Sequence, residues 1–213
     1  MNTKNYLEKK KLIFWDFDGV IKDSNNEKSL AFISTVQTSN ESLKKKIAYH
    51  HFKNIGLSRF KKIPLYLKWN NQSFSKKNLN KIYDNLSKKL ILNVSRSKWV
   101  KGSYNYIKQN YKKQIFVLIT STPQEEILRI LKKINIYKNF SDIYGFPNKK
   151  SQIISNVIKS NKVEKSQILF IGDSKNDYLA AKKNKISFLL RKTNENIELQ
   201  KKIRVRMFDH FND

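Results

Sequence analysis

Residues 12–20 read LIFWDFDGV, so that four apolar side chains run directly into two carboxylates, Asp16 and Asp18, and a glycine, Gly19. An apolar run without polar alternation is typical of a strand that is buried on both faces of a parallel sheet. In open sheets of this kind, ligands bind beyond the carboxyl ends of the strands. The two carboxylates therefore stand where a binding or catalytic site is expected.

Three further apolar runs, at residues 115–119, 168–171 and 186–190, have the same character. Between them, apolar residues recur at helical spacing, and we expect the first helix to start in a capping box over residues 122–125. The last helix is expected to turn Leu179, Ala180 and Ala181 inward, and an edge strand to run through residues 207–211. Strands that alternate with helices predict the α/β class, here a doubly wound parallel sheet.

One long interval breaks this alternation. About 100 residues separate Asp18 from Thr120, whereas a strand–helix–strand unit needs only ~30. Apolar residues within residues 25–100 follow a helical period. We therefore expect a core domain formed by residues 1–21 and 101–213, with residues 22–100 inserted as a helical subdomain.

Polar residues follow the other predicted strands as well. Thr120 and Ser121 come after the second run, and the segment from Gly172 to Asp177, which includes Asp173, comes after the third. A pair of lysines at positions 149 and 150 precedes the helix between these strands. A hydroxyl, an ammonium and two acidic pairs at one sheet edge are groups that handle a phosphate together with a divalent metal.

In this order, the four motifs resemble those of the haloacid dehalogenase (HAD) superfamily, in its phosphatase and β-phosphoglucomutase-like subgroup with a helical cap. The resemblance spans residues 12–190 and implies a Rossmann-like core, a Mg²⁺ ion and a small phosphorylated metabolite as substrate. It implies that Asp16 is the nucleophile and forms an aspartyl-phosphate, that Asp18 is the general acid and base, and that Thr120 and Lys150 contact the phosphoryl group. The implied metal ligands are Asp16, Asp18 (through its carbonyl) and Asp173, and the supporting residues are Asp177, Gly172 and Gly19.

Some assignments within these motifs stay open. Lys149 is the alternative to Lys150, which is preferred for its distance from Pro147 and for the helix that it would begin. Thr120 and Ser121 are also plausible helix caps, a role that is compatible with phosphate binding by Ser121 and the backbone amides beside it. The histidines at positions 50, 51 and 210 have no metal-ligand spacing and are interpreted as surface or packing residues.

The inserted segment offers one candidate substrate motif, Gly56-Leu57-Ser58-Arg59. It resembles the cap of β-phosphoglucomutase, which implies substrate binding by Ser58 and Arg59, and a guanidinium suits the bidentate binding of a distal phosphate. The alternative is that Gly56 ends one helix, Ser58 caps the next and Arg59 is solvated.

A phosphatase is the preferred function, and a sugar phosphomutase is the alternative. The mutases of this family carry a histidine and threonines after the first motif, where this chain has Lys22-Asp23-Ser24 and Lys28. Asp18 argues against a dehalogenase, which has no need of a second acid. A third hypothesis is a non-enzymatic protein that binds polyanions or nucleic acid.

The composition limits these hypotheses. The net charge is +27, but only six of the 44 basic residues are arginine and the lysines are spread along the whole chain, so we expect solvated lysines and no specific nucleic-acid partner. The absence of cysteine excludes disulfides, thiolate nucleophiles and cysteine-ligated metals. No apolar run reaches the ~20 residues of a membrane span, and residues 1–11 do not read as a signal peptide. We therefore expect a cytoplasmic monomer or homodimer.

Overall fold

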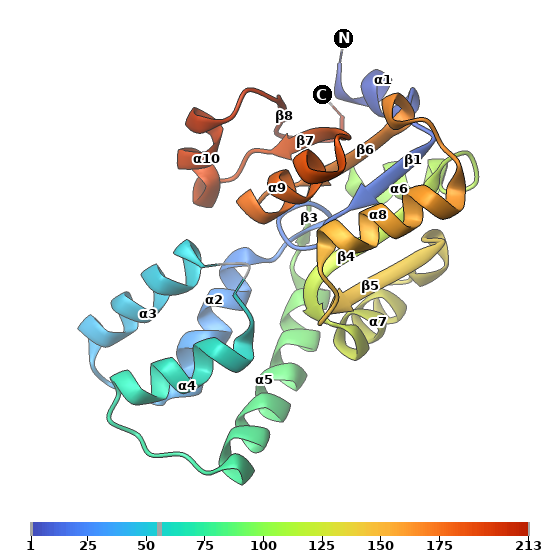
Figure 1. Cartoon of the computed structure of the whole chain (residues 1–213). Helices are drawn as coiled ribbons and strands as arrows, with labels where there is room; N and C mark the ends of the chain where they lie inside the picture. The colour runs from blue at the N-terminus through green and yellow to red at the C-terminus, as the bar shows by residue number, and fades with distance from the viewer. Residues whose placement is uncertain (1, 55–56, 213) are drawn as a thin grey trace. The chain divides into compact units, whose positions relative to one another are not determined.

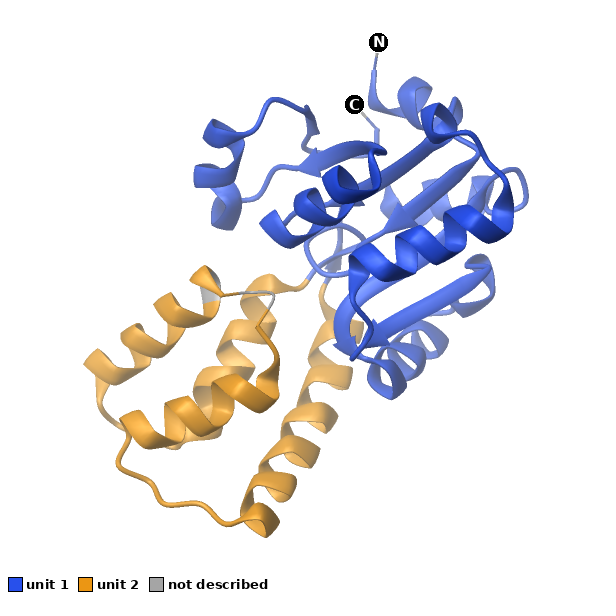
Figure 2. Cartoon of the chain, viewed as in Figure 1, with its two compact units in different colours: residues 1–23, 98–213 blue, residues 24–97 orange. Residues whose placement is uncertain are grey.

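The computed structural model describes residues 2–54 and 57–212, apart from the side chain of Phe52. The chain divides into two compact units, residues 1–23 with 98–213 and residues 24–97 (Figure 2). The strands β2 (Lys22–Asp23) and β3 (Lys98–Trp99) pair antiparallel where the chain passes between the units, and both belong to the larger unit. The boundaries between the units therefore lie a few residues inside those expected from the sequence.

The larger unit contains a six-stranded sheet in the order β5-β4-β1-β6-β7-β8, in which every neighbouring pair is parallel (Figure 1). This confirms the predicted α/β class. The strands are β1 (Leu12–Trp15), β4 (Ile115–Pro123), β5 (Asp142–Phe146), β6 (Ile168–Gly172), β7 (Ser187–Arg191) and β8 (Arg206–Phe208). The prediction missed β5, an edge strand that is only partly buried, and it placed the last edge strand slightly too late and too long.

Helices cover both faces of this sheet. The longer helices of the unit are α6 (Ser103–Asn110), α7 (Gln124–Lys133), α8 (Lys150–Asn161) and α9 (Lys175–Asn184), and the short ones are α1 (Thr3–Glu8) and α10 (Ile197–Lys202). Leu12 and Phe14 pack in a core with α8 and α9. Trp15 lies on the other face, where its ring contacts Tyr106 of α6 at 6.0 Å and Phe211 at 5.4 Å. The strand β1 is therefore buried on both sides, as its unbroken apolar run predicts.

Two details of the helix predictions are wrong. The strand β4 continues through Pro123, which pairs with Phe146 of β5, so no capping box forms at residues 122–125 and α7 begins at Gln124. On α9, Ala180 and Ala181 are buried, whereas Leu179 is 46% exposed. Successive helical residues are turned by about 100°, so three consecutive side chains do not all face the sheet.

The smaller unit is helical, with no strand among its described residues. Its helices are α2 (Asn25–Ile33), α3 (Glu41–Lys53), α4 (Arg59–Trp69) and α5 (Lys76–Arg96), with the short 3₁₀ turn η1 (Ser34–Val36) after α2. The helix α2 packs against both α3 and α5. None of the helices in the described residues is both long and apolar enough to cross a membrane.

Candidate active site

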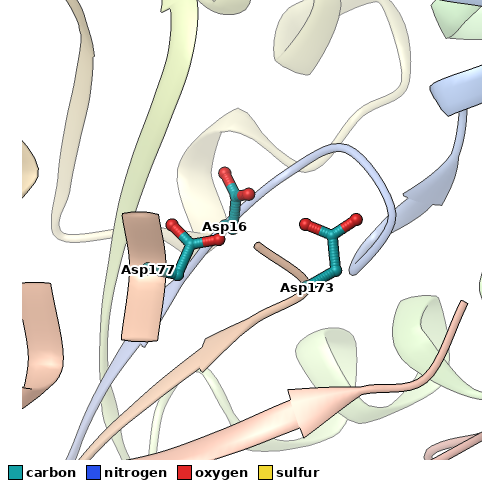
Figure 3. A group of neighbouring side chains, drawn as sticks. All are labelled: Asp16, Asp173 and Asp177. Atoms are coloured by element: carbon teal, nitrogen blue, oxygen red, sulfur yellow. The ribbon is translucent and has the colours of Figure 1, made fainter. Parts of the chain in front are cut away.

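Three carboxylates meet at the carboxyl edge of the sheet. The adjacent parallel strands β1 and β6 pair Trp15 with Ile171, so the segments that follow them leave the sheet at the same edge. Asp16 follows β1, Asp173 follows β6, and Asp177 lies in the first turn of α9. One oxygen from each lies within 4.8 Å of the others, and all three side chains are buried (Figure 3).

The ammonium of Lys150 joins two of these carboxylates. Lys150 is the first residue of α8, and its Nζ lies 2.9 Å from Oδ1 of Asp16 and 2.6 Å from Oδ1 of Asp177. Lys149 precedes the helix and its side chain is exposed. Of the two candidate lysines, the structure therefore brings Lys150 to the carboxylates.

Asp177 is held from both sides. Its Oδ2 accepts hydrogen bonds from the backbone N–H of Ser174 at 3.1 Å and from the Ser174 hydroxyl at 2.6 Å. The backbone N–H of Asp177 donates to Oγ of Ser174 at 3.3 Å, which completes the capping box of α9. Its Oδ1 accepts from Lys150. Gly172 permits this approach, because a Cβ at that position would overlap Cβ of Asp177. Asp177 therefore holds the ammonium of Lys150 in place, and its close approach requires glycine at position 172.

The electrostatics of the cluster are dominated by burial and by crowding of like charge. Burial, and then the Asp177 carboxylate, raise the pKa of Asp16 well above its usual value, although Lys150 opposes this shift. Burial alone would lower the pKa of Lys150, but Asp16 and Asp177 outweigh it and hold the pKa above its usual value. The lysine is therefore a fixed cation in a site that has an excess of acidic groups.

The donor set suits a hard divalent cation. Mg²⁺ prefers oxygen ligands and is commonly held by one or two carboxylates. Lys150 contacts Oδ1 of Asp16 and both oxygens of Asp177 accept hydrogen bonds, so Oδ2 is the oxygen of Asp16 that fits an ion. The carboxylate of Asp173 supplies the other oxygen donor of the cluster. The Asp18 carboxylate is not a member of the three-carboxylate group found among the described residues.

Asp18 instead contacts Thr122, for which the sequence predicts a place in a helix capping box. Oγ1 of Thr122 donates to Oδ2 of Asp18 at 3.3 Å, and the backbone N–H of Thr122 donates to Oγ1 of Thr120 at 3.2 Å. Thr120 and Thr122 are both buried, whereas Ser121 between them is exposed. Side chains alternate along a strand, so Thr120 and Thr122 share one face of β4 and Ser121 points to the other. Had the strand been predicted to continue to residue 123, Thr122 would have been the site candidate in place of Ser121.

Two residues outside the sequence motifs, Arg191 and Asn196, hold the loops that follow β1 and β6. Gly19 has φ +72°, a conformation that favours glycine, and its N–H donates to the carbonyl of Lys22 at 2.7 Å. Its own carbonyl accepts from Nη1 of Arg191 at 3.4 Å. Nδ2 of Asn196 donates to the carbonyls of Asp173 at 2.7 Å and of Arg191 at 2.8 Å. Arg191 and Asn196 therefore connect the two acidic loops, and no sequence motif had marked them.

The two substrate-binding candidates of the smaller unit differ in environment. Ser58 caps α4, because its hydroxyl accepts from the N–H of Phe60 at 3.3 Å, as the alternative interpretation expected. Arg59, the first residue of α4, is buried, so the expectation of a solvated arginine is wrong. Gly56 lies outside the described residues.

Comparison with known proteins agrees with this geometry. The family model of the haloacid dehalogenase-like hydrolases matches residues 13–190, which include all four motifs. The chain belongs to this family. The curated phosphoglycolate phosphatase of Vibrio cholerae is 37% identical over 73 residues, and the match covers 32% of this chain and 32% of that relative. The matched stretch thus spans about a third of the relative's length. The match is consistent with the family, and the substrate of this chain is taken up under the proposed function.

Solved structures of other HAD proteins have the same fold. A predicted phosphoglycolate phosphatase from Haemophilus somnus superposes with a TM-score of 0.77 at 20% identity, covering 96% of both chains. The Bacillus subtilis protein YfnB, whose crystal holds magnesium, superposes with a TM-score of 0.71 at 14% identity and covers 95% of this chain and 96% of its own. At these identities the likeness establishes the fold.

Proposed function

We propose that this chain is a Mg²⁺-dependent phosphatase that hydrolyses a small phosphorylated metabolite through an aspartyl-phosphate on Asp16. The observation that carries the proposal is the position of Lys150, whose ammonium contacts Asp16 and Asp177 while Asp173 lies within the same 4.8 Å cluster. The membership of the HAD hydrolase family and the partial match to phosphoglycolate phosphatases support it.

The attack of a carboxylate on a phosphate dianion has to overcome repulsion between like charges. At about 4 Å and an effective dielectric constant near 20, each pair of charges repels by ~4 kcal/mol. Lys150 offsets part of this repulsion from a fixed position beside Asp16. When bound, Mg²⁺ supplies further positive charge to the phosphoryl oxygens, and the groups that would hold it are Asp16, Asp173 and the backbone carbonyl of Asp18. Magnesium in the crystal of YfnB is consistent with this choice of ion.

The remaining residues have separate parts in the two proposed steps. An oxygen of Asp16 attacks phosphorus, the bond from phosphorus to the leaving alcohol breaks, and Asp18 gives its proton to that alcohol. Asp18 then takes a proton from water, which attacks the aspartyl-phosphate and regenerates Asp16. Thr122 holds the Asp18 carboxylate through its hydroxyl, and the Thr120 hydroxyl contacts the phosphoryl group. Ser121 is assigned to phosphate binding through its backbone amide.

The smaller unit, residues 24–97, is assigned the role of the cap that selects the substrate. Arg59 is the proposed contact for the remote end of the substrate, and Ser58 maintains the start of its helix. Hydrolysis is preferred to mutase chemistry because Lys28 and its neighbours replace the histidine and threonines expected of a mutase. Phosphoglycolate is the first substrate to test, since the matched Vibrio relatives are named for it.

The test is a measurement of phosphate release from a panel of phosphorylated sugars, nucleotides and short acids, with and without Mg²⁺. Asp16→Asn should abolish turnover of every substrate that the parent chain hydrolyses. Asp142→Asn, which changes an exposed carboxylate at the start of β5, is the matched control and should leave turnover intact. Activity of Asp16→Asn within a few-fold of the parent would remove Asp16 from the role of nucleophile.

A further inference from the structure

The pairing of β4 with β5 is interrupted just before Gln124. The register of the two strands shifts between Ile119 and Pro123, where three residues of β4 lie opposite the single residue Gly145 of β5. Such a bulge interrupts the regular ladder, so backbone groups of the partner strand need other hydrogen-bond partners. The bulged residues are 120–122, which carry the two threonines of the candidate active site.

The side-chain amide of Gln124 supplies these partners. Its Oε1 accepts a hydrogen bond from the backbone N–H of Gly145, and its Nε2 donates to the carbonyl of Ile143 at 3.0 Å. A Cβ on Gly145 would lie only 2.6 Å from the carbonyl oxygen of Thr122, so the two backbones are in direct contact. One side chain thus replaces the ladder across the bulge and holds β5 against the segment that bears Thr122.

The same glycine is connected to the start of α8. The carbonyl of Gly145 accepts hydrogen bonds from the backbone N–H of Asn148 at 3.3 Å and from its Nδ2 at 3.1 Å. The helix begins two residues later, at Lys150, and the side chain of Lys149 makes no capping hydrogen bond with any described residue. The turn after β5 therefore fixes the place at which α8 begins.

We propose that Gln124 is a positioning residue for the lysine of the active site. By joining the bulge of β4 to Gly145, it sets the place of the Lys150 ammonium beside Asp16. The proposal rests on the phosphatase function proposed above, which gives Lys150 its part in the reaction. The stabilisation of charge in a transition state depends closely on geometry, so a shift in the start of α8 should lower the rate.

The first test compares the parent with Gln124→Met and with Gln152→Met, which makes the same change at an exposed position of α8. Methionine has a similar length and lacks the amide. In Gln124→Met, kcat for phosphate release should fall roughly tenfold and KM should change less than about twofold, because the group acts on the reacting atoms and not on the rest of the substrate. Gln152→Met should match the parent in both parameters.

A double-mutant cycle with Lys150→Met shows whether Gln124 acts through the lysine. If it does, adding Gln124→Met to the Lys150→Met chain lowers kcat by less than about twofold, since the two effects are then not additive. If the roughly tenfold loss occurs in both backgrounds, Gln124 acts independently of Lys150 and the proposal is overturned.

A second measurement needs no turnover. The ammonium signal of Lys150, identified by its absence from Lys150→Met, is followed by NMR in each full-length chain. Its hydrogens should exchange with water roughly ten times faster in Gln124→Met than in the parent and in Gln152→Met. Equal exchange in the three chains would show that α8 is held sufficiently by α9, where Nδ2 of Asn184 donates to the carbonyl of Ser151, and would overturn the proposal.

The two measurements separate failure of this proposal from failure of the proposed function. If the parent hydrolyses none of the phosphorylated compounds, the phosphatase function is wrong, and the exchange measurement alone decides whether Gln124 holds Lys150. Should Gln124→Met fail to fold, Gln124→Glu takes its place in each assay. This variant keeps the acceptor for Gly145 and loses the donor to Ile143, so both effects should have the same direction.

Discussion

Nζ of Lys150 lies 2.9 Å from Oδ1 of Asp16, although one residue begins α8 and the other follows β1. The same ammonium reaches Asp177 on α9, so the lysine draws together three separate segments of the sheet edge. The contact combines a structural and a chemical effect, because it offsets the charge of the proposed nucleophile and holds its orientation.

Replacing Lys150 by methionine should lower kcat by about 10²–10³-fold, the usual effect of removing a group that stabilises charge in the transition state. The matched Lys149→Met, on the exposed neighbour, should stay within about twofold of the parent. Phosphate release at saturating substrate is the measurement, with far-UV circular dichroism to confirm folding. Similar activities for the two variants would show that the lysine at 150 has no special part in the reaction.

The Thr122→Val variant removes the hydroxyl that donates to Asp18 and keeps the shape of the side chain. A hydrogen bond of this kind contributes ~1 kcal/mol, which corresponds to roughly a fivefold fall in kcat. Ser121→Ala, on the exposed side of β4, is the control and should leave kcat unchanged, since the proposed contact there is through the backbone. An unaltered pH profile and kcat in Thr122→Val would contradict a positioning role for this threonine.

Asn196→Ala should destabilise the fold and weaken metal binding. It leaves the buried carbonyls of Asp173 and Arg191 without their side-chain donor, at a cost of about 1–3 kcal/mol. Because the Asp173 loop is then less well fixed, we expect Mg²⁺ to raise the melting temperature less than it does in the parent. Asn194→Ala, at an exposed position nearby, is the control. A variant that loses stability but keeps the full response to Mg²⁺ would limit Asn196 to a structural role.

Lys62→Met should change how stability depends on pH. Lys62 of α4 is only 1% exposed, and burial, and then the charge of Lys28, lower its pKa from 10.5 to about 7. The unfolded chain therefore binds more protons than the folded chain between these values, and stability of the parent rises with pH over that interval. The variant should be more stable than the parent at pH 6, and the gap should narrow by pH 9. A difference of 1 kcal/mol corresponds to roughly 2–4 °C in Tm for a domain of this size.

The matched Lys61→Met variant changes the exposed neighbour on the same helix and is the control for the loss of a lysine side chain. Thermal unfolding of the three chains at pH 6, 7.5 and 9 is the measurement. A gap between Lys62→Met and the parent that is constant over this range would mean that Lys62 has an ordinary pKa in the folded protein.

The amino-acid sequence was sufficient to predict the class of the fold. The apolar runs that became β1, β4, β6 and β7 are strong signals, because a strand buried on both faces has little room for polar residues. The edge strand β5 escaped prediction for the converse reason, since it is partly exposed and mixes Asp142 with apolar residues. Leu179 was misplaced because three adjacent apolar residues do not reveal which of them faces the core.

The chain by itself determined which residue types are available at the sheet edge, because a motif such as Asp16-Phe17-Asp18 is local and its place after a strand can be read directly. Only the tertiary structure brought Lys150 to Asp16, Thr122 to Asp18 and Asn196 to Asp173. It alone buried Lys62 beside His51. The reason is physical: these relationships depend on which way a side chain turns at the end of an element and on neighbours far away in the sequence, and no local pattern of residues encodes either.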